Sequence, residues 1–131
     1  MSDNAQLVRG AYEAFGRGDV PGVLAVLAED VVWDSPEPLP QAMNAHGRDE
    51  VGQFFQKVAS EWDEIEVNVD DLVTAGDRVC VLGHAAGKLD GRSTGYDFAH
   101  SWTLRNGSCV SFHEYVDPEP ELLAAPARSG P

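Results

Sequence analysis

The feature that most constrains this chain is a change in hydrophobic period near residue 64. Before it, apolar residues recur at the three- to four-residue spacing of amphipathic helices. After it, Ile65, Val67 and Val69 alternate with acidic or polar residues, as in a half-buried strand. This change of period predicts helices followed by an antiparallel sheet, which is an α+β domain.

The first half of the chain predicts three helices, each with an apolar stripe on one side. Asp19 can cap the second helix, and Pro21 lies in its first turn, where a missing N–H is tolerated. The elements expected in chain order are a helix over 3–16, a helix over 19–27, a β-prone run over 31–33, a proline-rich loop over 35–41 and a helix over 47–62.

The second half predicts four strands joined as a meander. Asn106-Gly107 is the strongest local signal in the chain, a two-residue hairpin turn, and Asp90-Gly91 is a second hairpin signal. Helices covering one face of a bent sheet leave space that the side chains of the sheet cannot fill, so we expect a ligand pocket there. The strands are expected from residue 64, over 78–88, over 94–105 and over 108–116.

Length and charge limit the classes of function. The 131 residues fit one domain, with an ordered core expected over about 4–117 and a loose tail over 118–131. A net charge of −13 repels nucleic-acid phosphates and anionic membranes. The start of the chain lacks a signal-peptide pattern, and no apolar run approaches the ~20 residues of a membrane span. We therefore expect a cytoplasmic protein without nucleic-acid or membrane partners.

The two cysteines, Cys80 and Cys109, both fall in strand-like segments. We expect two free, buried thiols in a reducing compartment, and a disulfide between neighbouring strands is the alternative. The sequence has no close-spaced motif of His, Cys and carboxylate ligands and no glycine-rich phosphate loop. We therefore expect neither a metal nor a cofactor.

Four stretches, in a fixed order and spacing, carry a family resemblance. They are Tyr12-Glu13-Ala14-Phe15 with Gly18-Asp19, Ala28 through Trp33, Gly47 through Val51 with Phe54-Phe55, and His100 through Tyr115. Each stretch is weak alone. Together they cover most of the chain, and it resembles the SnoaL-like group of the nuclear transport factor 2-like and ketosteroid isomerase-like superfamily.

The resemblance implies a fold and partners. The fold is a cone-shaped, cystatin-like or nuclear transport factor 2-like roll, with three N-terminal helices packed on a curved, mainly antiparallel sheet. Such proteins usually form a homodimer through the sheet and hold a small organic molecule between the sheet and the helices. Members include polyketide cyclases, steroid isomerases, epoxide hydrolases and dehydratases, and many are non-catalytic, so the fold alone does not fix the function.

The resemblance to the polyketide cyclases implies an acid–base pair. Aligned on the Asn106-Gly107 hairpin, His100 takes the position of the family's His, and Glu114 replaces its Asp with one more methylene. Such a pair in an apolar pocket could remove a proton alpha to a carbonyl and return it elsewhere. A slip of one residue in register would instead turn Glu114 to solvent, leaving His100 as an ordinary core residue.

Steroid isomerase and hydrolase chemistry fits the sequence less well. The position of the isomerase base is Ser35 here, and Asp34 should point to the opposite face unless the chain turns it inward. The isomerase Tyr falls near Ala11, one position from Tyr12.

Strand alternation places His113 on a solvent or dimer face. The residues expected to bind the substrate are Tyr12, Trp33, Ser35, Phe55, His84, Trp102 and Phe112.

The sequence therefore predicts a cofactor-independent acid–base enzyme for an uncharged carbonyl compound, with His100 and Glu114 as catalytic residues. One alternative is a non-catalytic ligand-binding or dimerisation module of the same fold. A further alternative is an isomerase or hydrolase that uses Asp34 as its base.

Overall fold

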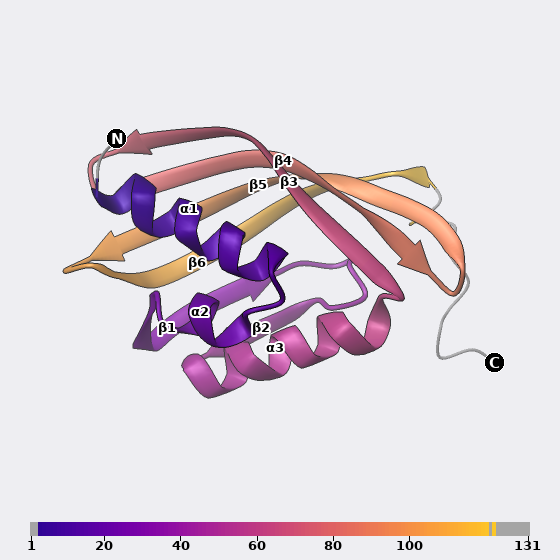
Figure 1. The fold of residues 1–131 in the computed structure, drawn as a ribbon, viewed down its shortest axis with the longest axis horizontal. Helices are drawn as coiled ribbons and strands as arrows, with labels where there is room; N and C mark the ends of the chain where they lie inside the picture. Colours follow the sequence, from indigo (N-terminus) through magenta and orange to yellow (C-terminus); the bar gives the residue numbers. More distant parts are fainter. Residues whose placement is uncertain (1–2, 121, 123–131) are drawn as a thin grey trace.

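The computed structural model of this chain describes residues 3–120 and 122. Most of the loose tail predicted over 118–131 lies outside the described residues, but Pro118 ends the last strand and Leu122 is buried. The elements, shown in Figure 1, are α1 (Asp3–Gly16), α2 (Val20–Leu24), β1 (Leu27–Ser35), β2 (Met43–His46), α3 (Arg48–Glu61), β3 (Glu64–Ala75), β4 (Arg78–Leu89), β5 (Arg92–Arg105) and β6 (Ser108–Pro118).

The strands form one mixed sheet of six strands in the order β2-β1-β6-β5-β4-β3. The predicted meander is confirmed, because β3 to β6 pair antiparallel in sequence order. The β1 strand joins β6 in parallel and carries β2 at the edge. The edge strand β2 was not predicted from the sequence. The prediction that Leu27 lies on the second helix was wrong, because Leu27 is the first residue of β1.

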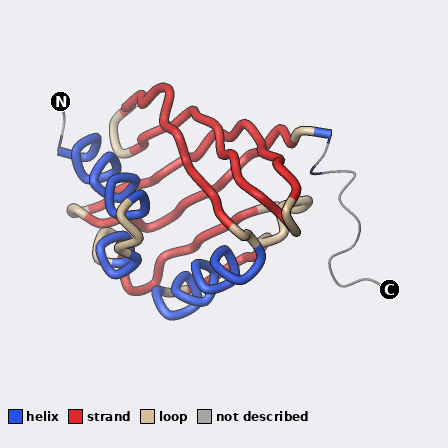
Figure 2. The backbone as a smooth tube through the Cα atoms, turned by 45° about the vertical axis from the view of Figure 1, so that its right-hand side comes forward, coloured by secondary structure: helices blue, strands red, loops and turns tan. Residues whose placement is uncertain are grey.

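The three helices lie on one face of the sheet, and the long strands bend over them (Figure 1). The tube in Figure 2 shows the same separation, with the helices along one side of the strands. Asp19 caps α2 as predicted, because its side chain accepts a hydrogen bond from the backbone N–H of Gly22. The apolar stripes of α1 and α3 pack against the inward side chains of the sheet and close it on this side.

Two glycines of β4 allow the sheet to bend sharply. A Cβ atom at Gly83 would overlap the carbonyl oxygen of Asn68 on β3 and lie 2.7 Å from Cζ of Phe98. A Cβ atom at Gly87 would overlap the carbonyl oxygen of Glu64. Glycine at these positions therefore permits the close backbone approach that curves β3 and β4 over the helices.

The β5–β6 hairpin contains a β-bulge that sets the register of everything beyond it. Next to the Asn106-Gly107 turn, Leu104 pairs with Cys109, but the next pair is Thr103 with Ser111. Val110 is the extra, unpaired residue of β6. The bulge shifts the register by one residue, so that His100 pairs with Glu114.

The outer face of the sheet carries an apolar row across three strands. Leu82 on β4 and Tyr115 on β6 both pair with Ala99 on β5, and they are 43% and 62% exposed. Among the described residues, no helix is long and apolar enough to cross a membrane.

Substituting Gly83 tests the role of the close approach. We expect Gly83→Ala to lower the free energy of unfolding by roughly 1–3 kcal/mol, because the added methyl group meets backbone and the Phe98 ring. Gly10→Ala is the matched control: a Cβ there meets nothing within 4 Å, and alanine in a helix should add about 0.5–1 kcal/mol. Urea unfolding measures both, and equal effects of the two substitutions would contradict the account.

Candidate functional site

His100 and Glu114 face each other on neighbouring strands, on the side of the sheet that the helices cover. They are direct partners in the β5–β6 register, and the distance from Nε2 of His100 to Oε2 of Glu114 is 2.8 Å. Only 7% of His100 and 6% of Glu114 is exposed. The predicted proximity of this pair is thus confirmed, and the slipped register that would turn Glu114 to solvent is excluded.

Three more side chains extend the pair into a hydrogen-bonded network. The Ser35 hydroxyl, at the end of β1, donates to Oε1 of Glu114 at 2.7 Å. The Tyr12 hydroxyl from α1 contacts Nδ1 of His100. Nε1 of Trp102 donates to the same hydroxyl at 2.9 Å. Residues from β1, β5, β6 and α1 therefore meet at one buried point.

The donors in this network decide where the proton of the imidazole lies. The indole N–H of Trp102 can only donate, so the Tyr12 oxygen accepts from it. Burial raises the pKa of Tyr12 well above its ordinary value, so the phenol keeps its proton and can donate it to Nδ1 of His100. A neutral imidazole in this arrangement carries its proton on Nε2 and donates it to the Glu114 carboxylate.

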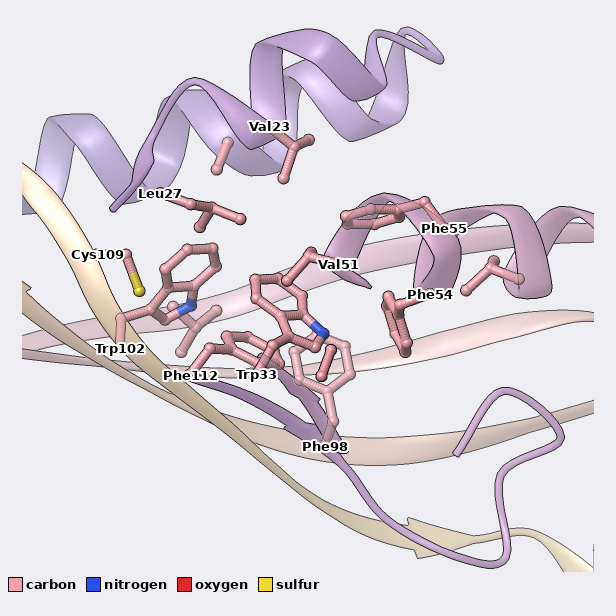
Figure 3. Packing of buried hydrophobic residues seen from close by; sticks show 14 of the residues in the cluster. Val23, Leu27, Trp33, Val51, Phe54, Phe55, Phe98, Trp102, Cys109 and Phe112 are labelled. Atoms are coloured by element: carbon pink, nitrogen blue, oxygen red, sulfur yellow. The ribbon is translucent and has the colours of Figure 1, made fainter. Parts of the chain in front are cut away.

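An apolar cavity of about 70 Å³ lies against this network. Aromatic rings form most of its wall, with Trp33 stacked on Phe112 at 3.8 Å and Phe98 stacked on His100 at 3.9 Å between ring centroids. Figure 3 shows Trp33, Phe98, Trp102 and Phe112 of the sheet facing Phe54 and Phe55 of α3. Of the predicted substrate-binding residues, the cavity is lined by Tyr12, Trp33, Phe55, Trp102 and Phe112.

A second polar group in the cavity wall involves Gln41 and Tyr96. Nε1 of Trp62 donates to Oε1 of Gln41 at 2.9 Å, and Nε2 of Gln41 donates to the Tyr96 hydroxyl at 3.3 Å. Burial, and secondly the charge of Glu114, raise the pKa of Tyr96 far above its ordinary value. The Tyr96 hydroxyl is therefore a neutral donor at physiological pH.

Sequence reasoning missed Gln41, Tyr96 and Phe98 as lining residues. A signal existed for two of them, because Tyr96 and Phe98 share the strand alternation of His100 and Trp102 on β5. No such signal existed for Gln41, since it lies in the loop between β1 and β2 and reaches the cavity only through the tertiary fold.

The prediction that His84 binds the substrate was wrong. Its side chain is 47% exposed, and its Nδ1 lies 3.3 Å from Oδ2 of Asp70 on the outer face of the sheet. In the β4–β5 register Val81 pairs with His100 and points inward, so a residue three positions along β4 points outward. Alternation along β4 does not by itself show which of its two faces lies against the helices.

The alternative that uses Asp34 as a base is also contradicted. Asp34 points to the outer face, where its carboxylate lies 3.7 Å from Nδ1 of His113. Ser35, the next residue, points inward and binds Glu114 instead. His113 lies on the outer face, as predicted.

Both cysteines are free thiols. Cys80 lies on β4 and Cys109 on β6, with β5 between them, so the alternative of a disulfide across neighbouring strands does not apply. Cys109 is fully buried, and its burial raises the pKa of the thiol to about 12. An uncharged thiol of this kind packs as a small apolar group.

Comparison with known proteins finds relatives over most of the chain. The family model of the SnoaL-like domain matches residues 8–112. An NTF2-like protein of unknown function from Burkholderia pseudomallei K96243 is 40% identical, with a TM-score of 0.83 over 89% of this chain and 92% of that chain. A search of curated proteins found no significant match.

Two further solved structures carry more specific names. TerC, co-crystallised with polyporic acid, is 27% identical, with a TM-score of 0.81 over 88% of this chain and 92% of that chain. A protein of Xanthomonas campestris pv. campestris, provisionally named a polyketide cyclase, is 27% identical, with a TM-score of 0.71 over 88% of this chain and 90% of that chain. These likenesses show an NTF2-like, cystatin-like fold with helices packed on a six-stranded mixed sheet.

The buried phenols predict how stability depends on pH. Tyr12 and Tyr96 have a raised pKa in the folded chain, so between about pH 10 and that raised value only the unfolded chain loses these protons. Their contribution is complete below about pH 10 and is lost above it, by about 1.4 kcal/mol per pH unit for each phenol.

Urea unfolding from about pH 8 to about pH 11 should show this fall in the wild-type chain and a shallower fall in Tyr96→Phe. The same slope in both chains would contradict the burial of the Tyr96 hydroxyl.

Proposed function

The chain belongs to the SnoaL-like domain family, and we propose that it is a cofactor-independent acid–base enzyme acting on an uncharged carbonyl compound. One observation carries the proposal. The His100–Glu114 pair is buried in the wall of an apolar cavity, with hydrogen bonds that fix both partners. Acid–base groups converging on an apolar cavity are typical of an enzyme active site.

Glu114 is the proposed base. Its two carboxylate oxygens accept from Ser35 and His100, and each oxygen keeps a second lone pair. The carboxylate removes a proton from the carbon next to the carbonyl: the C–H bond breaks, an O–H bond forms on Glu114, and the electron pair moves into an enolate. Return of that proton to another atom of the ligand completes an isomerisation or a cyclisation step.

His100 is proposed to hold the base in place and to stabilise its charge. Both ring nitrogens are occupied, Nε2 by Glu114 and Nδ1 by Tyr12, so the imidazole has no free nitrogen for the ligand. Hydrogen bonds to a carboxylate are stronger than neutral ones and can offset the loss of water around the charge. Tyr12 and Trp102 fix the orientation of the ring.

The walls support an uncharged, largely apolar ligand, and the names of two relatives support a small organic one. The cavity is lined mainly by aromatic and aliphatic side chains, and the net charge of −13 disfavours the approach of an anion. The relative TerC was co-crystallised with polyporic acid, and another relative is provisionally named a polyketide cyclase. Both names are consistent with a small organic ligand in this family.

A non-catalytic module of the same fold is the second candidate, and it is favoured because side chains leave only a small cavity. At about 70 Å³ it is less than half of the roughly 150 Å³ that binds benzene in an apolar protein interior. A ligand must therefore displace a side chain of the wall. Under this alternative a carbonyl compound binds, but its alpha protons do not exchange faster.

Deuterium exchange of acetophenone tests the proposal. We expect the protein to accelerate exchange of the methyl protons in D2O, followed by proton NMR. Glu114→Gln should reduce the acceleration by about 100-fold or more, because the amide cannot accept the proton. Asp34→Asn is the matched control, since it makes the same chemical change on the outer face of the sheet and should leave the rate unchanged.

Two outcomes would overturn the proposed chemistry. Full activity in Glu114→Gln would remove Glu114 as the base. Binding of acetophenone without any acceleration of exchange would favour the non-catalytic module.

A further inference from the structure

The indole N–H of Trp33 lacks an acceptor. Among the described residues, two buried side-chain polar atoms have no hydrogen-bond partner, Nε1 of Trp33 and Oγ1 of Thr94, and of these residues only Trp33 lines the cavity. Trp33 is 3% exposed. A buried donor left without a partner costs about 1–3 kcal/mol, and phenylalanine at this position would avoid that cost.

Trp33 lines the same cavity as the acid–base pair. Trp33 on β1 pairs with Phe112 on β6, two residues before Glu114. In Figure 3 the indole nitrogen lies on the side of Phe54 and Phe98, and the Phe98 ring stacks on His100 at 3.9 Å. The residue with the unpartnered N–H therefore belongs to the same cavity wall as the catalytic pair.

The indole N–H groups of the other two tryptophans each have an acceptor, which Trp33 lacks. Nε1 of Trp62 donates to Gln41, and Nε1 of Trp102 donates to Tyr12. Tyr96, in the same cavity wall, accepts from Gln41, and its own hydroxyl proton has no acceptor among the described residues. The wall thus holds unused donors in addition to the Glu114 carboxylate, and the matching partner for the Trp33 donor is an oxygen that accepts.

We propose that the indole N–H of Trp33 donates a hydrogen bond to the carbonyl oxygen of an aryl ketone or a related flat carbonyl compound. This inference rests on the proposed function and names its substrate class. The aromatic part of the ligand packs against the phenylalanines of the wall, with the Phe54 ring, centred 5.6 Å from Trp33, moving aside. When Glu114 removes the alpha proton, negative charge develops on the carbonyl oxygen, and Trp33 stabilises it there.

A matched pair of ligands isolates the hydrogen bond. Acetophenone and α-methylstyrene have nearly the same shape, but the second has a CH2 group where the first has the carbonyl oxygen. The three indole N–H signals of the chain are observed by ¹H–¹⁵N NMR, and Trp33→Phe identifies the signal that belongs to Trp33.

We expect acetophenone to move the Trp33 proton signal downfield, because a hydrogen bond forms, and α-methylstyrene to leave it nearly in place. The signals of Trp62 and Trp102 should move less, since their N–H groups already have acceptors. In the exchange assay, Trp33→Phe should lower the rate about 100-fold, as expected for loss of one donor to an oxyanion.

The outcomes separate this inference from the proposed function. If acetophenone binds and exchanges in a Glu114-dependent way without moving the Trp33 signal, the role of Trp33 is wrong and the proposed function stands. An equal shift with both ligands would also overturn it, because the shift would then reflect ring packing. If neither ligand perturbs any of the three signals at saturating concentration, the ligand cavity and the role of Trp33 fall together.

Discussion

The β-bulge at Val110 determines which side chains of β6 enter the cavity. A regular ladder from the Asn106-Gly107 turn would place His113 opposite His100 and turn Glu114 to the outer face. One extra residue in β6 shifts the register, so that Glu114 faces His100 and Phe112 faces Trp102. The acid–base pair and the stacked aromatic wall both depend on this single unpaired residue.

Because the bulge turns Glu114 inward, its carboxylate is buried, and donors on neighbouring elements offset the cost of that burial. A carboxylate in an apolar wall is costly unless its oxygens are hydrogen-bonded. Ser35 and His100 supply one donor each, and Tyr12, held by Trp102, occupies the other nitrogen of the imidazole. Because these partners come from β1, β5 and α1, the network forms only when the sheet and the first helix are both in place. The indole N–H of Trp33, in the cavity wall, is a buried donor that the described residues leave without an acceptor.

Features that depend on local sequence could be predicted, and features that depend on pairing could not. The helix stripes, the cap at Asp19 and the Asn106-Gly107 turn are local, and they gave the helices and the meander. The bulge at Val110 and the edge strand β2 arise from contacts with other strands, so alternation alone left two registers open. For the same reason the pairing of His100 with Glu114 came from the family resemblance, and alternation alone did not show that the face of β4 with His84 lies outside.

The tautomer of His100 is the most direct test of the network on which this account depends. Long-range ¹H–¹⁵N correlation NMR of the imidazole distinguishes a protonated ring nitrogen from a bare one. For the neutral ring in the ligand-free protein, we expect a proton on Nε2, donated to Glu114, and a bare Nδ1 that accepts from Tyr12. A neutral ring with its proton on Nδ1 would contradict it, because the Glu114 carboxylate would then lack its donor from His100.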